Sequence, residues 1–308
     1  MALPFDAIPE VAIDYVRGVF RAANEKVSGA VSLHPSMHEE TLDHILIMDL
    51  TASPPAFFAT ERVGICLESH WLGSRWMLGR WEIADIAFFI LLRRQGTLLA
   101  RKVALLQTKR LYSREIPAVQ LDEADYQIGI GRLADRTDRT VPISSQRTFG
   151  FDSKSIYQAT EAGHPQVDRI EEYSERRGIP VYYGFYNPLT LPFRTAYPAL
   201  DGRAPEGGNA IGCRVTPAEN VHSVVRKLDA GRSPSVNDIT LPSPLDASDP
   251  SSTLGWRLEN FIADEVLRCR QGRHFEDLTD PNLRALLYER SAPISAAITI
   301  TIDIAEAG

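Results

Sequence analysis

The stretch 85-DIAFFILLRRQGTLLARKVALLQTK-109 decides which fold this sequence predicts. It begins with an aspartate, continues with two apolar runs on either side of a glycine, and ends with Gln-Thr-Lys. Uninterrupted apolar runs of this kind are typical of strands that are buried on both faces in the middle of a sheet. We therefore expect residues 85–92 and 98–108 to form an antiparallel hairpin that turns at Gly96.

The polar residues of this stretch lie at the two ends of the hairpin. Gly96 is equally far in sequence from Asp85 and from Gln107, so a hairpin folded about Gly96 places these two residues opposite each other. Side chains alternate between the two faces of a strand, so Lys109 shares the face of Gln107. This register requires a turn of odd length, because a two-residue turn would place Asp85 and Gln107 on opposite faces.

A carboxylate, an amide oxygen and an ammonium group would thus converge at one end of the hairpin. Carboxylate and amide oxygens are ligands for a hard cation such as Mg²⁺ (or Mn²⁺), whose shell is completed by water and phosphate. A lysine nearby can orient a water and stabilise the charge that develops on a phosphate. The three residues therefore predict metal-assisted phosphodiester cleavage. Taken singly, Asp85 also suits the cap of a strand, and Lys109 suits a charge that extends into water.

Helices and strands alternate around the hairpin, which predicts an α/β (α+β) protein with a mixed central sheet flanked by helices. Ser36 and Glu39 fit a capping box at the start of one helix. The other expected elements are helices at 9–26, 36–50, 153–162, 165–177, 218–228, 255–271 and 280–290, and strands at 62–71, 179–187 and 294–304. We expect an N-terminal helical segment (1–35), a core (36–199) and a C-terminal extension (200–308) that is a lid, a specificity module or an oligomer surface, separate or packed on the same domain.

The bulk composition limits the class of protein. The chain has 308 residues, a net charge of −7 and three cysteines without a Cys-x-x-Cys pair, which fits a reducing cytoplasm and no disulfide framework. The N-terminus does not have the pattern of a signal peptide, and the longest apolar run (86–92) is too short to cross a membrane. We therefore expect a cytoplasmic protein without a membrane partner.

Positive charge is concentrated in the hairpin although the chain as a whole is acidic. No Asp or Glu occurs from Ile86 to Arg114. The basic residues of this stretch are Arg93, Arg94, Arg101, Lys102, Lys109, Arg110 and Arg114. Two interpretations remain open at this point, namely solvated strand ends and an edge that faces phosphates.

The order of elements from 36 to 187 and the residues at the ends of the hairpin resemble the PD-(D/E)XK (restriction-endonuclease-like) nuclease superfamily. In that family an aspartate begins the second core strand, and an acid-x-Lys triplet ends the third. Asp85 matches the first position and 107-QTK-109 the second, with glutamine in place of the acid, which is the Q-x-K variant. The series 38-HEETLDHIL-46, 103-VALLQTKRL-111 and 180-PVYYGFYNP-188 also resembles an uncharacterised bacterial group of such nucleases.

The resemblance implies an α-β-β-β-α-β nuclease core and a Mg²⁺ or Mn²⁺ cofactor. It also implies a nucleic-acid substrate, most readily DNA, and a role in bacterial phage defence or mobile-element biology. It also implies a glutamate on the first core helix, for which Glu39 and Glu40 both qualify. Glu82 is a candidate for an additional metal ligand. Homo-oligomerisation stays open. The alternative is a catalytically inactive nuclease-like scaffold that binds nucleic acid or a protein partner.

Candidate contacts with nucleic acid lie outside the hairpin ends. Arg110 follows the Gln-Thr-Lys triplet, and Gln166 and Arg169 lie near the start of the helix at 165–177, where an N-terminus favours anions. Aromatic and basic residues also alternate in one segment, namely Trp71, Arg75, Trp76, Arg80 and Trp81. Such a segment either stacks on bases or packs a loop onto the core.

Overall fold

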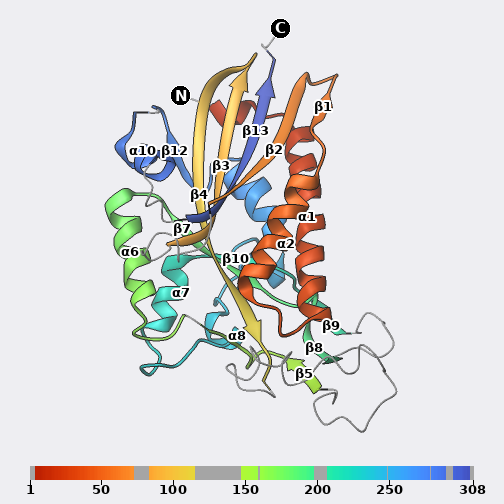
Figure 1. Ribbon diagram of the computed structural model, residues 1–308, viewed down its shortest axis with the longest axis vertical. Coiled ribbons are helices and arrows are strands. Elements are labelled where there is room, and N and C mark those ends of the chain that lie inside the picture. Colours follow the sequence, from red (N-terminus) through yellow and green to blue (C-terminus); the bar gives the residue numbers. More distant parts are fainter. Residues whose placement is uncertain are drawn as a thin grey trace.

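The apolar hairpin forms the two central strands of a large mixed sheet, β3 (Ala84–Arg94) and β4 (Thr97–Tyr112) (Figure 1). The structure is a computed structural model that describes residues 4–72, 83–114, 147–158, 160–197, 207–247, 249–277, 279–288 and 294–305. The strand β3 lies between β4 and β13 (Ile294–Ile304), and β4 pairs with β7 (Val181–Tyr186). The predicted position in mid-sheet is confirmed.

The sheet contains both parallel and antiparallel neighbours, in the order β1-β2-β13-β3-β4-β7-β10-β11. Here β13 is parallel to β3 and β7 is parallel to β4, whereas β3 and β4 are antiparallel. Its other strands are β1 (Ala56–Phe58), β2 (Val63–Trp71), β10 (Arg214–Pro217) and β11 (Trp256–Arg257), and β6 (Ile156–Tyr157) and β12 (Arg273–Phe275) also pair with β4. A second sheet consists of β5 (Arg147–Phe151), β8 (Thr190–Tyr197) and β9 (Gly207–Ala210). The predicted α+β class with a mixed sheet flanked by helices is confirmed.

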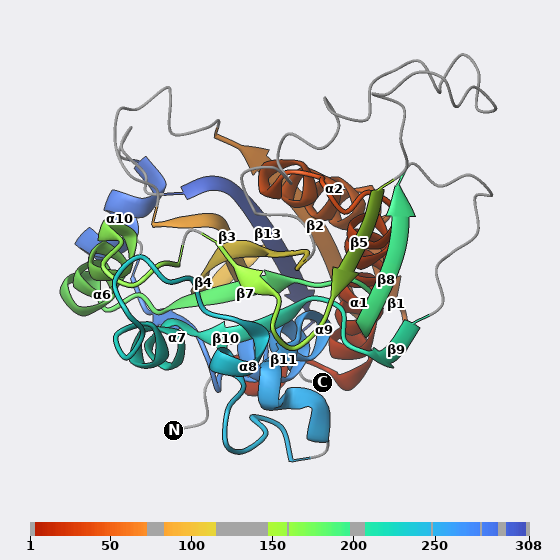
Figure 2. The same ribbon diagram turned by 90° about the horizontal axis from the view of Figure 1, so that it is seen from below.

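Helices cover both faces of the large sheet (Figure 2). On one face α1 (Glu10–Leu33), α2 (Glu39–Ala52), α9 (Leu258–Asn260) and the π-helix η5 (Phe261–Val266) enclose one hydrophobic core. On the other face α6 (Pro165–Arg177), α7 (Ala218–Val225), α8 (Val236–Ile239) and α10 (Pro281–Tyr288) enclose a second. Short 3-10 helices lie at Pro4–Ala7 and Pro250–Leu254.

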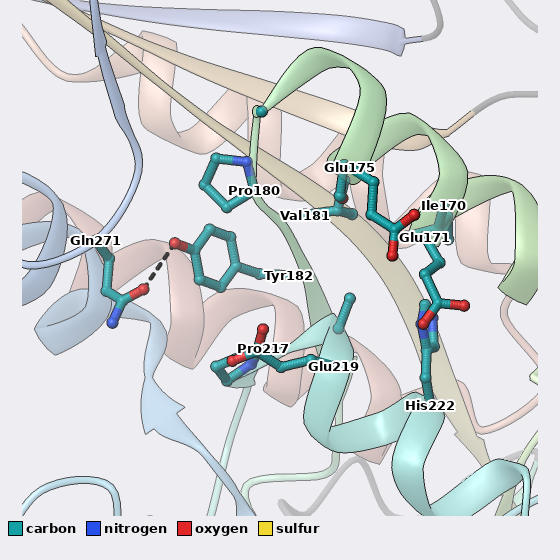
Figure 3. A pocket seen from close by; sticks show the side chains of 13 residues that line it. Ile170, Glu171, Glu175, Pro180, Val181, Tyr182, Pro217, Glu219, His222 and Gln271 are labelled. Carbon is teal, nitrogen blue, oxygen red and sulfur yellow. Dashed lines mark hydrogen bonds between the residues drawn. The ribbon is translucent and has the colours of Figure 1, made fainter.

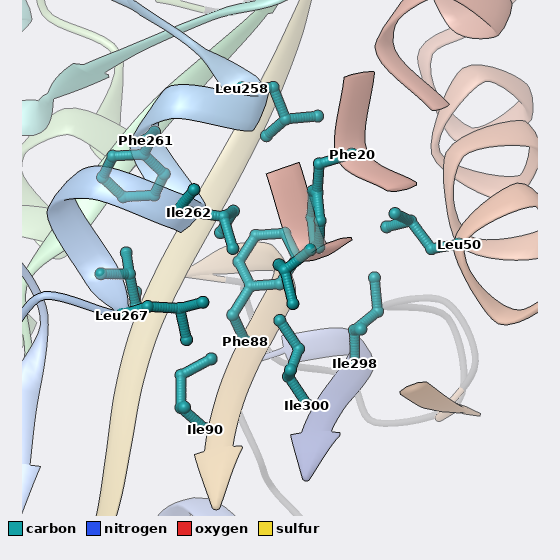
Figure 4. Packing of buried hydrophobic residues seen from close by; sticks show 14 of the residues in the cluster. Phe20, Leu50, Phe88, Ile90, Leu258, Phe261, Ile262, Leu267, Ile298 and Ile300 are labelled. Carbon is teal, nitrogen blue, oxygen red and sulfur yellow. The ribbon is translucent and has the colours of Figure 1, made fainter. Parts of the chain in front are cut away.

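The first core is built from side chains that are far apart in sequence. Phe20 of α1 meets Phe88 of β3 edge to face, with ring centroids 5.7 Å apart. Ile300 of β13 and Phe261 of η5 pack in the same cluster (Figure 4). Fully burying side chains of this size contributes about 1.5–3 kcal/mol each. This packing joins residues 258–304 to the face that α1 and α2 cover.

The turn of the hairpin differs from the predicted one. Arg94 pairs with Thr97, so the loop consists of the two residues Gln95 and Gly96, and the expectation of an odd-length turn is wrong. Both loop residues have positive φ, 48° and 79°, as a type I′ hairpin turn requires. Glycine adopts such a φ without steric penalty, which explains its position here.

A β-bulge restores the register that the two-residue turn would otherwise lose. Next to the turn Arg93 pairs with Leu98, but the following pair is Leu92 with Ala100. Leu99 is therefore an extra residue in β4, and every pair beyond it is shifted by one position. The predicted register beyond the bulge is thus correct, although it arises from a bulge rather than from the length of the turn.

Several predicted elements are confirmed and others are wrong. The helix at 165–177 and the strand at 294–304 have the predicted bounds, and Gly178 caps α6 with a φ of 62°. The helix at 153–162 is wrong, because the short strand β6 lies there. The helix at 255–271 is wrong in type, because 256–266 contains a short strand, α9 and a π-helix.

The capping box at the start of α2 is also wrong. The N-cap is His38, which makes no side-chain cap hydrogen bond, and α2 begins at Glu39. The side chain of Ser36 is buried in front of the helix. A capping box would have turned Glu39 back onto the helix, whereas its carboxylate contacts β4 instead.

The basic residues of the hairpin do not form a continuous solvated edge. Arg101, Lys102, Lys109 and Arg110 are buried. Lys102 Nζ donates to the carbonyl of Val266 at 2.7 Å. Because most of these cations are inside the protein, neither of the two sequence interpretations describes the stretch as a whole. Within the described residues, no helix is both long enough and apolar enough to cross a membrane.

Candidate functional site

Asp85 and Gln107 meet at the end of the β3–β4 hairpin, as the sequence predicts. Ile86 pairs with Leu106, so the next positions outward are Asp85 and Gln107. Gln107 Nε2 donates to Asp85 Oδ2 at 2.5 Å. Thr108 donates to the same oxygen twice, from its backbone N–H at 2.6 Å and from Oγ1 at 3.0 Å. The Asp85 carboxylate is therefore held in one orientation by three donors on β4.

Lys109 extends to the start of α2. Its side chain is only 2% exposed, and Nζ donates to Glu39 Oε1 at 3.1 Å and to the Thr108 carbonyl at 2.7 Å. The backbone N–H of Arg110 donates to Glu39 Oε2 at 3.1 Å. Of the two candidate glutamates, Glu39 is thus the one bound to β4, whereas Glu40 is exposed.

Asp43 belongs to this cluster and was not predicted. It lies one helical turn after Glu39 on α2, and its side chain is 4% exposed. Asp43 Oδ1 accepts from the Tyr186 hydroxyl at 2.6 Å. Asp43 Oδ2 lies 3.1 Å from Thr108 Oγ1, so it shares the single proton of this hydroxyl with Asp85 Oδ2. The signal in the sequence is an acid in phase with the apolar positions Leu46 and Leu50 of the same helix, because a charge on a buried face requires partners.

The electrostatics of the cluster are dominated by crowded carboxylates, of which Asp43 is buried and Asp85 and Glu39 are partly buried. Burial raises the pKa of Asp43 well above its usual range, and the charges of Asp85 and Glu39 raise it further. The pKa of Glu39 and that of Asp85 are also raised, in each case mainly by burial, with Glu40 contributing to the shift at Asp85. Burial alone would lower the pKa of Lys109, but Glu39 and Asp85 outweigh it and raise that pKa. A second cation at this position would relieve the repulsion among the acids.

The oxygen of the Gln107 amide fits the ligand of such a cation. Gln107 Oε1 is buried and has no hydrogen-bond partner among the described residues. The amide cannot turn this oxygen away without losing the bond from Nε2 to Asp85. Buried amide oxygens are normally satisfied, and an amide oxygen beside a carboxylate is a donor set for a hard cation. Within the described residues, no group of three or more His, Cys, Asp and Glu side chains is arranged to hold a metal ion.

The other predicted site residues lie elsewhere. The Arg110 side chain is buried and donates to the carbonyls of Pro35 at 3.3 Å and Met37 at 2.8 Å, so a contact with phosphate would require it to leave the α1–α2 connection. Gln166 and Arg169 lie on α6, on the face of the sheet opposite α2, and their contact with nucleic acid stays a prediction.

The aromatic segment is described only in part. Trp71 is the last residue of β2, and it is 44% exposed. Trp76, Trp81 and the predicted metal ligand Glu82 lie outside the described residues. Of this group, only Trp71 can therefore be placed relative to the cluster.

A pocket of about 390 Å³ lies between α6, α7 and β7, and none of the predicted residues lines it (Figure 3). Glu171, Glu175 and Glu219 line it together with His222, and no Lys or Arg is among its described lining residues. Tyr182, also at its wall, donates from its hydroxyl to Gln271 Oε1 at 2.8 Å. This pocket is separate from the carboxylate cluster.

The cluster at the end of the hairpin can therefore perform two kinds of chemistry. Its oxygens can bind a hard cation, and the ammonium group of Lys109 can bind an anion or orient a water. Both groups are held by backbone and side-chain partners from β4 and α2. Comparison of the chain with family models, with curated proteins and with solved structures gives no match.

Proposed function

We propose that this protein is a divalent-metal-dependent nuclease of the PD-(D/E)XK type that hydrolyses phosphodiester bonds, with DNA as the first substrate to test. One observation carries the proposal, namely that the buried Gln107 Oε1, beside the Asp85 carboxylate and near the Lys109 ammonium, has no hydrogen-bond partner among the residues that the structure describes. An amide oxygen, a carboxylate and a lysine on two adjacent strand ends suit a metal and a phosphate together. Phage defence or mobile-element biology is the proposed setting.

Each residue of the cluster has a role in this proposal. Asp85 and Gln107 would hold Mg²⁺ or Mn²⁺, which supplies Lewis-acid activation of the phosphate and a more acidic bound water. Lys109 would orient the attacking water and stabilise the charge on the phosphate. Glu39 keeps Lys109 charged and positioned through their ion pair. Asp43 would act indirectly, because it shares the single proton of the Thr108 hydroxyl with Asp85.

The test is cleavage of plasmid DNA with Mg²⁺, with Mn²⁺ and with EDTA. We expect nicking by the wild type with either metal, none with EDTA, and loss of at least about a hundredfold in rate for Lys109→Met. The matched control is Lys102→Met, which removes another buried lysine of the same strand that donates to the Val266 carbonyl instead. Equal rates for the wild type and Lys109→Met under all conditions would refute the enzymatic proposal.

A measurement without turnover tests the metal site separately. We expect Mn²⁺ to raise the unfolding temperature of the wild type, because a ligand that binds only the folded state stabilises it. Asp85→Asn removes the charged ligand that is proposed for the ion among the described residues and should abolish this shift. A shift of the same size in the variant would place the ion elsewhere.

The alternative is a catalytically inactive nuclease-like scaffold that binds nucleic acid or a protein partner. It is favoured by the glutamine at position 107, which provides one negative charge fewer than an acid, and by the Glu39 carboxylate that already neutralises Lys109. Retarded migration of DNA together with absence of cleavage, in the presence of Mg²⁺ and of Mn²⁺, would support this alternative.

A further inference from the structure

An exposed aromatic pair flanks the carboxylate cluster. Trp71 at the end of β2 and His44 of α2 contact each other edge to face, with ring centroids 5.3 Å apart and an angle of 87° between the rings. Trp71 is 44% exposed, and His44 is exposed as well. A large aromatic ring that is held at a defined angle and partly open to solvent is a surface on which a planar group can stack.

The register of the sheet places this pair beside the site. Trp71 pairs with Ala296 of β13, and Ala296 pairs with Ile86 of β3, the residue next to Asp85. Adjacent strands are about 4.8 Å apart, so the backbone of Trp71 is roughly 10 Å from this end of β3. A single nucleotide spans a distance of that order.

The helix α2 connects the aromatic pair with the acids. Glu39 and Asp43 lie one turn apart on the side that contacts β4. Glu40 and His44 are the residues that follow them, and both are exposed. Glu40 is close enough to raise the pKa of Asp85, and His44 touches Trp71. The aromatic surface is thus continuous with the candidate site along one helix.

We propose that the Trp71–His44 pair binds an unpaired base of a nucleic-acid strand whose backbone lies at the carboxylate cluster. The proposal rests on the proposed function and defines its substrate as a strand with at least one unstacked base. Stacking suits this position because it does not depend on charge, whereas the acids at the site repel phosphate. A base inside a regular duplex has no free face for Trp71, so single strands and distorted duplexes are the favoured substrates.

The test is binding of a fluorescent single-stranded oligonucleotide to the full chain in EDTA, where no metal supports cleavage. We expect Trp71→Leu to weaken binding about tenfold, because base–aromatic stacking is lost while apolar bulk remains. The factor should be the same at low and at high salt, since no phosphate contact is removed. An abasic strand of the same length should bind wild type and Trp71→Leu equally.

The matched control is Phe57→Leu. Phe57 is an aromatic residue of β1 that is 71% exposed. It pairs with Gly64, which pairs with Asp303, which in turn pairs with Arg93, so Phe57 lies at the other end of the same sheet. We expect this variant to bind like the wild type. A loss of binding in Phe57→Leu as large as that in Trp71→Leu would indicate an unspecific effect and overturn the proposal.

The outcomes of the binding and cleavage measurements separate this proposal from the proposed nuclease function. Equal affinities of wild type and Trp71→Leu, or no binding of the single strand by the wild type, overturn the stacking proposal even if plasmid is cleaved. Weaker binding by Trp71→Leu without any cleavage by the wild type supports stacking and refutes the nuclease. Quenching of wild-type tryptophan emission by the strand, absent in Trp71→Leu, would show directly that the indole is the contact.

Discussion

The hydrogen bond from Tyr186 to Asp43 should stabilise the fold more than a neutral bond on the same strand. Tyr186 and Tyr183 are both fully buried on β7. The Tyr186 hydroxyl donates to the Asp43 carboxylate at 2.6 Å, whereas the Tyr183 hydroxyl contacts Nε2 of His222 at 3.2 Å. Replacing either tyrosine by phenylalanine removes one hydroxyl and leaves the ring in place, so the two variants form a matched pair.

The expected magnitudes follow from the acceptors. A hydrogen bond to a charged group contributes about 1.5–3 kcal/mol to the free energy of unfolding, and a neutral bond about 0.5–1.5 kcal/mol. Tyr186→Phe should therefore cost about 2 kcal/mol at a pH where Asp43 is ionised, and Tyr183→Phe about 1 kcal/mol. The difference should grow with pH, because the lost donor favours the ionised form of Asp43, whose pKa is already raised by burial and by Asp85.

The assay is urea unfolding of the wild type and both variants at several pH values, with unchanged slopes as evidence that only the native state is affected. Equal losses for the two variants at every pH would refute the assignment of Asp43 as a charged, buried acceptor. A larger loss of unfolding free energy for Tyr183→Phe would show that the hydrogen bond to His222 stabilises the fold more than the hydrogen bond to Asp43.

Three further perturbations have defined outcomes. Asp85→Asn should raise the unfolding temperature in EDTA, measured by calorimetry, because it removes one charge from crowded acids whose pKa values are raised; a lower temperature would contradict this. Burial lowers the pKa of His222 to about 4, so the unfolded state binds more protons than the folded state between pH 6.5 and 4. The free energy of unfolding should therefore fall as the pH drops through this range, by at most about 3 kcal/mol. His222→Gln should flatten this pH dependence in urea titrations, and an unchanged pH dependence would assign it to other groups. Deletion of Leu99 should leave the pairing of Asp85 with Gln107 intact, since only the extra residue of the bulge is removed. The unfolding temperature with Mn²⁺ measures this, and loss of the Mn²⁺ stabilisation in the deletion variant would show that the register had changed.

The candidate site could be predicted from local sequence only where local rules decide the geometry. The apolar runs of 85–109 and the alternation of side chains predicted that Asp85, Gln107 and Lys109 lie together. The prediction also assumed an odd-length turn, which was wrong, and the bulge at Leu99 supplies the register instead. The choice between Glu39 and Glu40 depends on where α2 begins and on its contact with Arg110, which is 71 residues away from Glu39. Residues adjacent in sequence differ by 100° around a helix, so a shift of one residue exchanges their roles.

Asp43 and the centre of the sheet were decided by tertiary structure. The partners of Asp43 are Thr108 and Tyr186, at separations of 65 and 143 residues, and no local pattern encodes such pairs. The strand at 294–304 was predicted from its alternation, but its insertion between β2 and β3 was not, because its neighbours are selected by packing across the whole chain.

By itself, the sequence predicted the long strands near 62–71, 85–108, 179–187 and 294–304, and the polar groups at the end of the hairpin. Those properties depend on periodicity and on the chemistry of single side chains, which act over a few residues. The tertiary structure decided the bulge at Leu99, the orientation of α2 and the burial of Lys109 and Arg110. These features result from the close packing of segments that are distant in sequence, where each contact depends on all the others.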